Sequence, residues 1–86
     1  MNQVIVSVKD TAAQAFGRPV FVPSIAVALR SFRDEVNRKD SNEDLARHPD
    51  DFELYELASF DDATGIIAML SEPRLVARAK DLKESV

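Results

Sequence analysis

The single histidine of this 86-residue chain and the acidic residues beside it are the side chains best suited to acid–base or metal chemistry. His48 is followed by Asp50 and Asp51, and an imidazole beside carboxylates can transfer protons or bind a metal ion. A transition-metal site built on one His is weak without a Cys, and the chain has no cysteine. We therefore interpret His48 as the end of a short helical turn that stops at Pro49.

Two further acidic groups resemble parts of known sites. Residues 61–65, Asp-Asp-Ala-Thr-Gly, offer oxygen ligands like half of a calcium loop, but the alternating ligands and distant Glu of an EF-hand do not follow. Asp50, Asp51, Glu53 and Glu56 could supply paired carboxylates for hydrolysis. We interpret residues 61–65 as a hairpin turn. Because no pocket-forming glycine loop or nucleophile accompanies the carboxylates, we interpret them as a solvated strand edge, and the absence of a Gly-x-Ser-x-Gly motif leaves a serine triad without support. The sequence predicts no enzyme, no metal site and no cofactor.

Basic residues fall in two groups that are candidates for nucleic-acid binding. One group is expected on the exposed side and end of a central helix, and the other on a C-terminal helix. If the two helices flank one groove in a dimer, the basic side chains could hold phosphates while Phe16 and Tyr55 stack on bases. The predicted nucleic-acid-binding residues are Arg30, Arg33, Arg38, Lys39, Arg74, Arg78 and Tyr55. The alternative is that both helices present ordinary solvated faces, paired with neighbouring acids.

The charge balance limits what such a surface can do. The chain carries 15 acidic and 11 basic residues, for a net charge of −4. Binding to nucleic acid without sequence preference normally comes from an excess of Lys and Arg, so the sign argues against a histone-like or coating role. No apolar run approaches the roughly 20 residues needed to span a bilayer, and we expect no contact with membranes.

Strands and one strong helix are predicted to position these side chains. Residues 3–8 are rich in Val and Ile and predict a strand. Residues 19–23 predict a short extended piece at a sheet edge, because a proline stands at each end. Ser24 is a good N-cap for a helix that ends near Asn37. The apolar stripe of this helix consists of Ile25, Ala28, Leu29, Phe32 and Val36.

The second half of the chain predicts a hairpin and a final helix. Residues 52–60 and 66–70 form the two arms, and Pro73 suits the first turn of a helix over about 72–84. We therefore expect one α+β domain over residues 1–86, with a three- or four-stranded mainly antiparallel sheet, an amphipathic helix on one face and a C-terminal helix. The open face would show Tyr55 and Leu57, and such exposed apolar area predicts a homodimer.

Six short motifs follow one another along residues 4–76. They are Asp10, Phe16-Gly17-Arg18-Pro19, Ala28-Leu29-Arg30-Ser31-Phe32, Val36-Asn37, Pro49-Asp50-Asp51-Phe52-Glu53-Leu54-Tyr55 and Phe60-Asp61-Asp62-Ala63-Thr64-Gly65. In this order and spacing the chain resembles the small non-structural protein of gokushovirus-type microviruses, which are single-stranded DNA phages. It departs from the family pattern at Val20, at Ala58 and in the basic tail over residues 74–83.

The resemblance implies a non-catalytic accessory protein of viral DNA replication, or of the switch to single-stranded DNA synthesis and packaging. Its partners would be single-stranded DNA or the phage replication and packaging proteins. It would act in the cytoplasm of the infected bacterium and be absent from the virion. The alternative is a protein-interaction module that targets a host factor without DNA contact, which the acidic net charge and the apolar sheet face favour.

Overall fold

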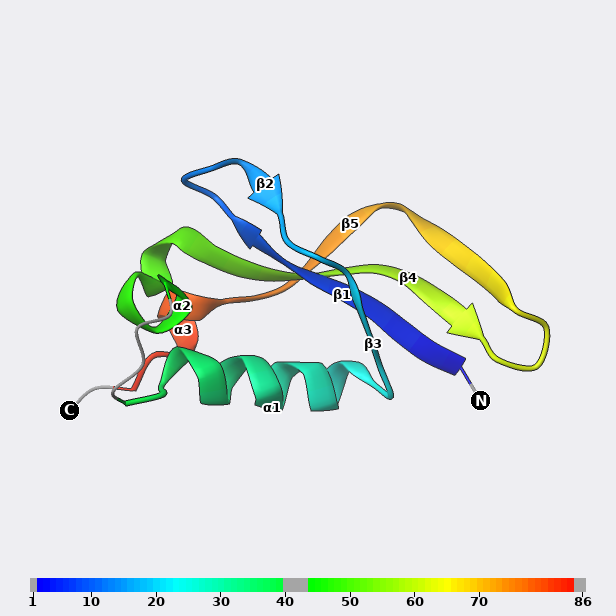
Figure 1. Ribbon diagram of the computed structural model, residues 1–86, viewed down its shortest axis with the longest axis horizontal. Helices are drawn as coiled ribbons and strands as arrows, with labels where there is room; N and C mark the ends of the chain where they lie inside the picture. Colours follow the sequence, from blue (N-terminus) through cyan, green and yellow to red (C-terminus); the bar gives the residue numbers. More distant parts are fainter. Residues whose placement is uncertain (1, 40–43, 85–86) are drawn as a thin grey trace.

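The computed structural model describes residues 2–39 and 44–84 and shows one long sheet with a helix along one side (Figure 1). The molecule measures 45 × 24 × 19 Å. In chain order the elements are β1 (Asn2–Asp10), β2 (Ala15–Phe16), β3 (Val20–Val22), α1 (Ile25–Val36), α2 (Asp44–Arg47), the 3-10 turn η1 (Pro49–Asp51), β4 (Phe52–Asp61), β5 (Ile66–Arg78) and α3 (Ala79–Leu82). This arrangement confirms the predicted α+β class.

The sheet is antiparallel throughout and is built around β1 and β4. Their pairing runs from Asn2 opposite Asp61 to Asp10 opposite Phe52. β5 pairs with the outer side of β4, while β2 and β3 share the outer side of β1. The prolines on either side of β3 are tolerated because this strand lies at the sheet edge, as the sequence predicts.

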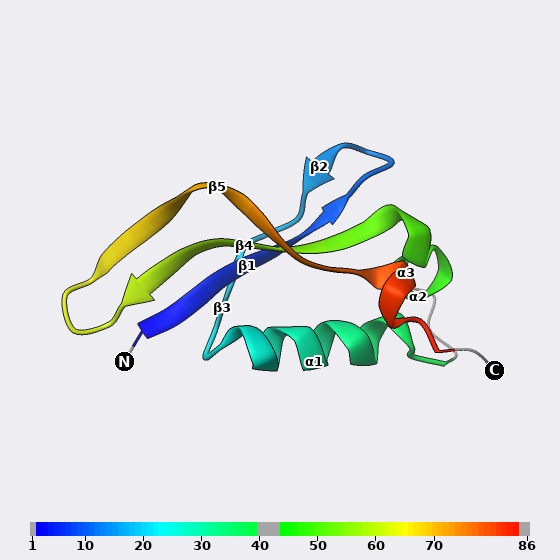
Figure 2. The same ribbon diagram turned by 180° about the vertical axis from the view of Figure 1, so that it is seen from behind.

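Helix α1 covers one face of the sheet and closes the core. The Ser24 hydroxyl accepts a hydrogen bond from the Val27 amide at 3.2 Å, which confirms the predicted N-cap. Its buried side chains meet the even-numbered side chains of β1. Figures 1 and 2 show from opposite sides that no described helix covers the other face of the sheet. The buried core cluster consists of Val6, Ala28, Phe32, Val36, Leu54 and Ala79.

The C-terminal helix is much shorter than the sequence predicts. The apolar spacing and Pro73 suggested a helix over about 72–84, but β5 continues to Arg78 and α3 covers only Ala79–Leu82. Pairing with β4 decides the outcome, because Arg74 lies opposite Glu56 and Arg78 opposite Glu53. A short helix cannot compete with such pairing, since helix nucleation is unfavourable.

The β4–β5 hairpin extends beyond α1 as an arm, which we define as residues 58–70 (Figure 1). The loop at its tip matches the predicted turn: the Asp61 carbonyl accepts the Gly65 amide at 2.7 Å, and the Asp61 carboxylate accepts the Ala63 amide at 2.9 Å. Gly65 has a φ of 76°, where a side chain would be strained. These contacts give the motif over residues 60–65 a structural explanation.

A large irregularity separates the arm from the rest of the hairpin. Ala58 lies opposite Met69 and Glu56 opposite Arg74, so the one residue between them on β4, Leu57, faces the four residues 70–73 of β5. Extra residues of this kind bend a strand and interrupt its edge. The arm is therefore a distinct segment of the sheet.

The end of α1 is tied to the C-terminal segment by one side chain. The Asn37 amide nitrogen donates to the carbonyls of Arg33 at 3.0 Å and Leu82 at 2.9 Å. The Asn37 amide oxygen accepts the Glu84 backbone N–H at 2.7 Å. Val36, the preceding residue, is fully buried. The Val36-Asn37 motif thus joins the last turn of α1 to α3.

We predict that Asn37→Ala lowers the free energy of unfolding by about 1–2 kcal/mol, because it leaves partly buried backbone groups without partners. Urea denaturation followed by circular dichroism measures this change. The matched control is Arg38→Ala, which removes an exposed ion pair with Glu35 and should cost less than about 0.5 kcal/mol. Equal losses in the two variants would contradict the role of Asn37.

Candidate nucleic-acid interface

The first group of predicted basic residues lies on and just after α1. Arg30 and Arg33 are exposed, and neither has an ion-pair partner among the described residues. Arg38 pairs with Glu35 at 3.2 Å on the exposed surface, and Lys39 is also exposed. Because Ala28, Phe32 and Val36 face the sheet, these cations lie on the outer side or at the end of the helix.

The second group does not form the predicted basic helix. Arg74 and Arg78 lie on strand β5, and each forms an ion pair with an acid of β4. Arg74 pairs with Glu56, and the Arg78 Nε lies 3.3 Å from a Glu53 carboxylate oxygen. A groove between two basic helices is therefore absent from the described residues, since one of the helices is a strand.

Tyr55 and Phe16 do come together, on the sheet face opposite α1. Their rings meet edge to face with centroids 5.3 Å apart, and the Lys9 ammonium lies 5.4 Å from the centroid of Phe16. Phe16 lies opposite Lys9, and Tyr55 lies opposite Ser7, so register puts all four on one face. The pair joins the edge strand β2 to the central strand β4.

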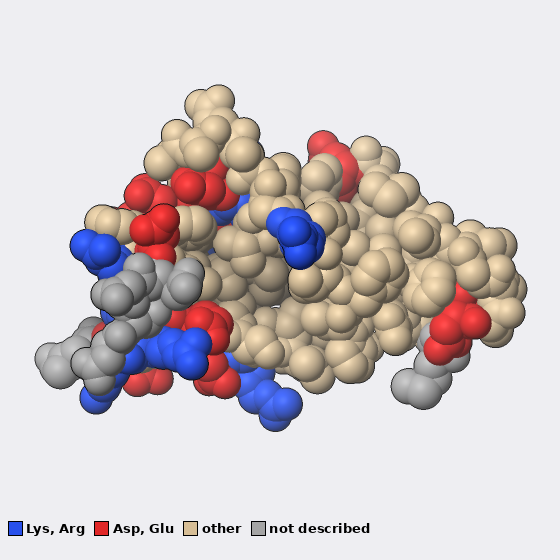
Figure 3. Space-filling model, viewed as in Figure 1, with Lys and Arg blue, Asp and Glu red and all other residues tan. Residues whose placement is uncertain are grey.

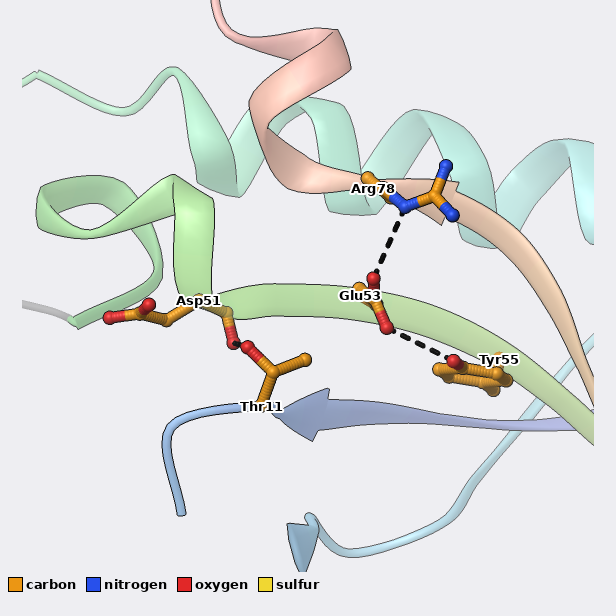
Figure 4. Close-up of polar contacts among 5 residues, drawn as sticks. All are labelled: Thr11, Asp51, Glu53, Tyr55 and Arg78. Atoms are coloured by element: carbon orange, nitrogen blue, oxygen red, sulfur yellow. Dashed lines mark hydrogen bonds and ion pairs between the residues drawn. The ribbon is translucent and has the colours of Figure 1, made fainter. Parts of the chain in front are cut away.

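A short hydrogen-bonded network fixes the Tyr55 hydroxyl (Figure 4). The hydroxyl donates to one Glu53 carboxylate oxygen at 3.0 Å, and the other oxygen accepts from Arg78 at 3.3 Å. Nearby, the Thr11 hydroxyl and amide both donate to the Asp51 carbonyl, at 3.0 and 2.7 Å. The end of β1 and the start of β4 are thereby held together beside the aromatic pair.

A second aromatic pair lies on the same face, towards the arm. Phe21 and Phe60 meet edge to face at 5.5 Å. In the strand register, Phe21 is paired with Ile5 and Phe60 with Gln3. Ile5 points away from α1, as Ser7 and Lys9 do. Four aromatic side chains therefore share this surface, which we call the aromatic face: Phe16, Phe21, Tyr55 and Phe60.

Sequence reasoning did not find the second pair or Lys9. Alternation along residues 3–9 shows which β1 residues share a face, but it does not show which partners lie opposite them. The partners of Ile5 are Phe21 on one side and Ala58 on the other, and a register shift follows directly after that pair. Only non-local pairing brings Phe21 and Phe60 together.

Charged residues are unevenly distributed over the surface. In the view of Figure 3, they gather at the end of the molecule where α2 and α3 lie, and few appear on the arm at the other end. The aromatic face carries the cations Lys9 and Arg78. Glu53 on β4 is paired with Lys9 of β1 on one side and with Arg78 of β5 on the other. Two cations beside aromatic rings suit a single nucleic-acid strand better than a duplex.

An apolar cleft of about 300 Å³ lies between α1 and the sheet. Phe32 and Leu54 line it, and Arg18 and Glu35 contribute the charged groups. Ser7 also lines it, but its hydroxyl is buried and donates to the Gly17 carbonyl at 2.8 Å. The cleft is an extension of the apolar core rather than a cluster of reactive side chains.

Comparison with protein families identifies this chain as a phage protein. Residues 3–82 match the family described as Phage ORF5 protein, and the chain belongs to that family. Comparisons with curated proteins and with solved structures give no match. None of the described helices is long and apolar enough to cross a membrane.

We predict that the Glu53 contact controls the ionisation of Tyr55. The hydrogen bond to the Glu53 carboxylate, together with burial and the Glu53 charge, raises the pKa of Tyr55 above its ordinary value of 10.0, although Arg78 opposes the shift. Tyr55 is the only tyrosine and there is no tryptophan, so the ultraviolet absorbance of tyrosinate measures its pKa directly. Glu53→Gln should move the midpoint back towards 10.0.

The same shift predicts how stability depends on pH. Because the pKa of Tyr55 is higher in the folded protein than in the unfolded chain, the contribution of Tyr55 to the free energy of unfolding is complete below the unfolded-state pKa. This contribution is lost as the pH rises through the folded-state pKa. The stability of the wild-type protein should therefore fall more steeply above pH 10.0 than that of Tyr55→Phe. Parallel curves for the two proteins would show that the hydroxyl contact is absent in solution.

Proposed function

We propose that this phage protein is a non-catalytic accessory of viral DNA replication that binds single-stranded DNA on the aromatic face. The observation that carries the proposal is the placement of two aromatic pairs on the one sheet face that no described helix covers. Phe16 and Phe21 are 42% and 52% exposed, so their rings are accessible to bases. Each stacked base contributes about 1–3 kcal/mol in proteins of this kind.

The charges of this face support a single strand as the ligand. Lys9 and Arg78 lie beside the Phe16–Tyr55 pair and can contact phosphates, although Glu53 reduces the local field. Two phosphate contacts predict a shallow salt dependence, with a slope of about −1.4 for log affinity against log salt concentration. The net charge of −4 disfavours general duplex binding.

The resemblance to the non-structural protein of gokushovirus-type microviruses supports the biological setting of the proposal. A single-stranded DNA phage exposes single strands whenever it copies and packages its genome. The protein would act at this stage, in the cytoplasm of the infected bacterium and outside the virion. Its role would be in replication or in the switch to single-stranded synthesis and packaging, alone or with the phage proteins that carry out these steps.

The alternative function is an interaction module for a host factor. The acidic net charge and the exposed apolar side chains favour it. The two functions differ in whether the purified protein binds an oligonucleotide at all.

We predict that a labelled single-stranded oligonucleotide binds the protein with a shallow salt dependence, as measured by fluorescence anisotropy. The double variant Phe16→Leu/Phe21→Leu should lose at least tenfold in affinity, because leucine keeps the apolar volume but removes the stacking surface. The control Arg30→Ala/Arg33→Ala changes the outer side of α1 and should alter affinity less than about twofold. Circular dichroism verifies that both variants are folded.

Two outcomes would contradict this proposal. If Arg30→Ala/Arg33→Ala weakens binding and the phenylalanine variant does not, the DNA site is the basic surface of α1 predicted from the sequence. If the wild-type protein shows no binding even at low salt, the protein is an interaction module, and a pull-down from infected cells becomes the next experiment.

A further inference from the structure

The arm carries an unusual concentration of exposed apolar side chains. Ile66 is 62% exposed, Ile67 49% and Met69 71%, with Leu70 also exposed. Together these four side chains leave an exposed apolar surface on the order of a few hundred Å² per copy. These side chains alternate between the two faces of the strand, and exposed apolar surface of a few hundred Å² often marks an interaction site.

The same segment is an unprotected sheet edge. Among the described strands, β5 pairs only with β4, so its other side presents backbone N–H and C=O groups without a strand partner. Proteins normally protect such edges with charges, proline or bulges. From residue 70 onwards β5 is protected in this way, by the irregularity at residues 70–73 and by Glu72, Pro73 and Arg74, but residues 66–69 have no such feature.

We propose that residues 66–70 are the interface with a second copy of this chain, formed by antiparallel pairing of the two β5 edges. The sequence Ile-Ala-Met around the midpoint of this segment is suited to self-pairing. With Ala68 opposite the same residue of the other copy, Ile67 faces Met69 and Ile66 faces Leu70 across a two-fold axis. Every pair is then apolar, and the smallest side chain lies at the centre.

The area is consistent with a dimer of moderate stability. The four exposed side chains supply part of the roughly 800 Å² that each partner of a standard interface buries. The backbone edge and Ala68 also become buried, and the edge hydrogen bonds add to the apolar contacts. Residues 66–70 carry no charged side chain, so like charges from two identical copies do not meet within the paired segment.

Pairing of the two β5 edges would also change the proposed DNA site, and this step rests on the proposed function. Residues directly opposite each other in antiparallel strands share a face, and Ile67 and Met69 lie on the same side of the sheet as Phe60 and Ala58. The aromatic faces of both copies would therefore form one continuous surface. A single strand could then pass from one copy to the other.

The first test is the oligomeric state, measured by sedimentation velocity at tens of micromolar protein. The wild-type protein should be a dimer, and Met69→Glu should be a monomer with an unchanged circular dichroism spectrum, because Met69 is mostly exposed within one copy. The matched control Ala13→Glu adds the same charge to an exposed loop at the other end of β1 and should remain a dimer. A monomeric wild-type protein, or a dimer that persists in Met69→Glu, would overturn the proposal.

The second test is the register. The chain has no cysteine, and opposed residues in antiparallel strands lie roughly 4.5–5.5 Å apart at Cα, which a disulfide can span. Oxidation should cross-link Ala68→Cys into a covalent dimer much faster than the nearby Ser71→Cys. The reverse order would refute pairing centred on Ala68. Both tests are independent of DNA, so failure of the dimer and failure of DNA binding are distinguishable.

Discussion

The pairing of β1 with β4 is the constraint on which the rest of this structure depends. It sends Val4, Val6 and Val8 to one side of the sheet and Ile5, Ser7 and Lys9 to the other. A chain of this size can build only one substantial apolar core, and α1 covers the valine side. The other side is left to the aromatic residues of the edge strands and β4. The sheet face opposite α1 is thus exposed because the chain has too few helices and strands to cover both faces.

The aromatic face combines structural and functional properties. Edge-to-face contacts bury part of each ring and stabilise the attachment of β2 and β3 to the sheet. Glu53 holds the Tyr55 hydroxyl and Arg78 at once. Among the described residues, no buried side-chain polar atom lacks a hydrogen-bond partner. A rigid ring surface of this kind loses little conformational entropy on binding, which suits contact with a flexible DNA strand.

Local sequence signals predicted most of the fold. The Ser24 cap, the stripe that includes Phe32 and Val36, and the turn ending at Gly65 each rest on neighbouring residues. The C-terminal helix was wrong because Leu75 and Ala79 have helical spacing while the pairing of β5 with β4 is non-local. For the candidate site, the sequence named Phe16 and Tyr55 as candidates for base stacking, and the structure places their rings in contact. Phe21 and Phe60 were not predicted, because their proximity depends on a register that passes through Ile5.

We propose that single-stranded DNA stacks on the sheet face opposite α1. Because Tyr55 is the only tyrosine in a chain without tryptophan, its intrinsic fluorescence reports on this face alone. The most direct measurement is therefore a fluorescence titration of the wild-type protein with a single-stranded oligonucleotide, run in parallel with anisotropy of a labelled strand. We expect saturable quenching of Tyr55 fluorescence, with the same midpoint as the change in anisotropy. Binding by anisotropy with unchanged Tyr55 fluorescence would contradict it and place the DNA on another surface.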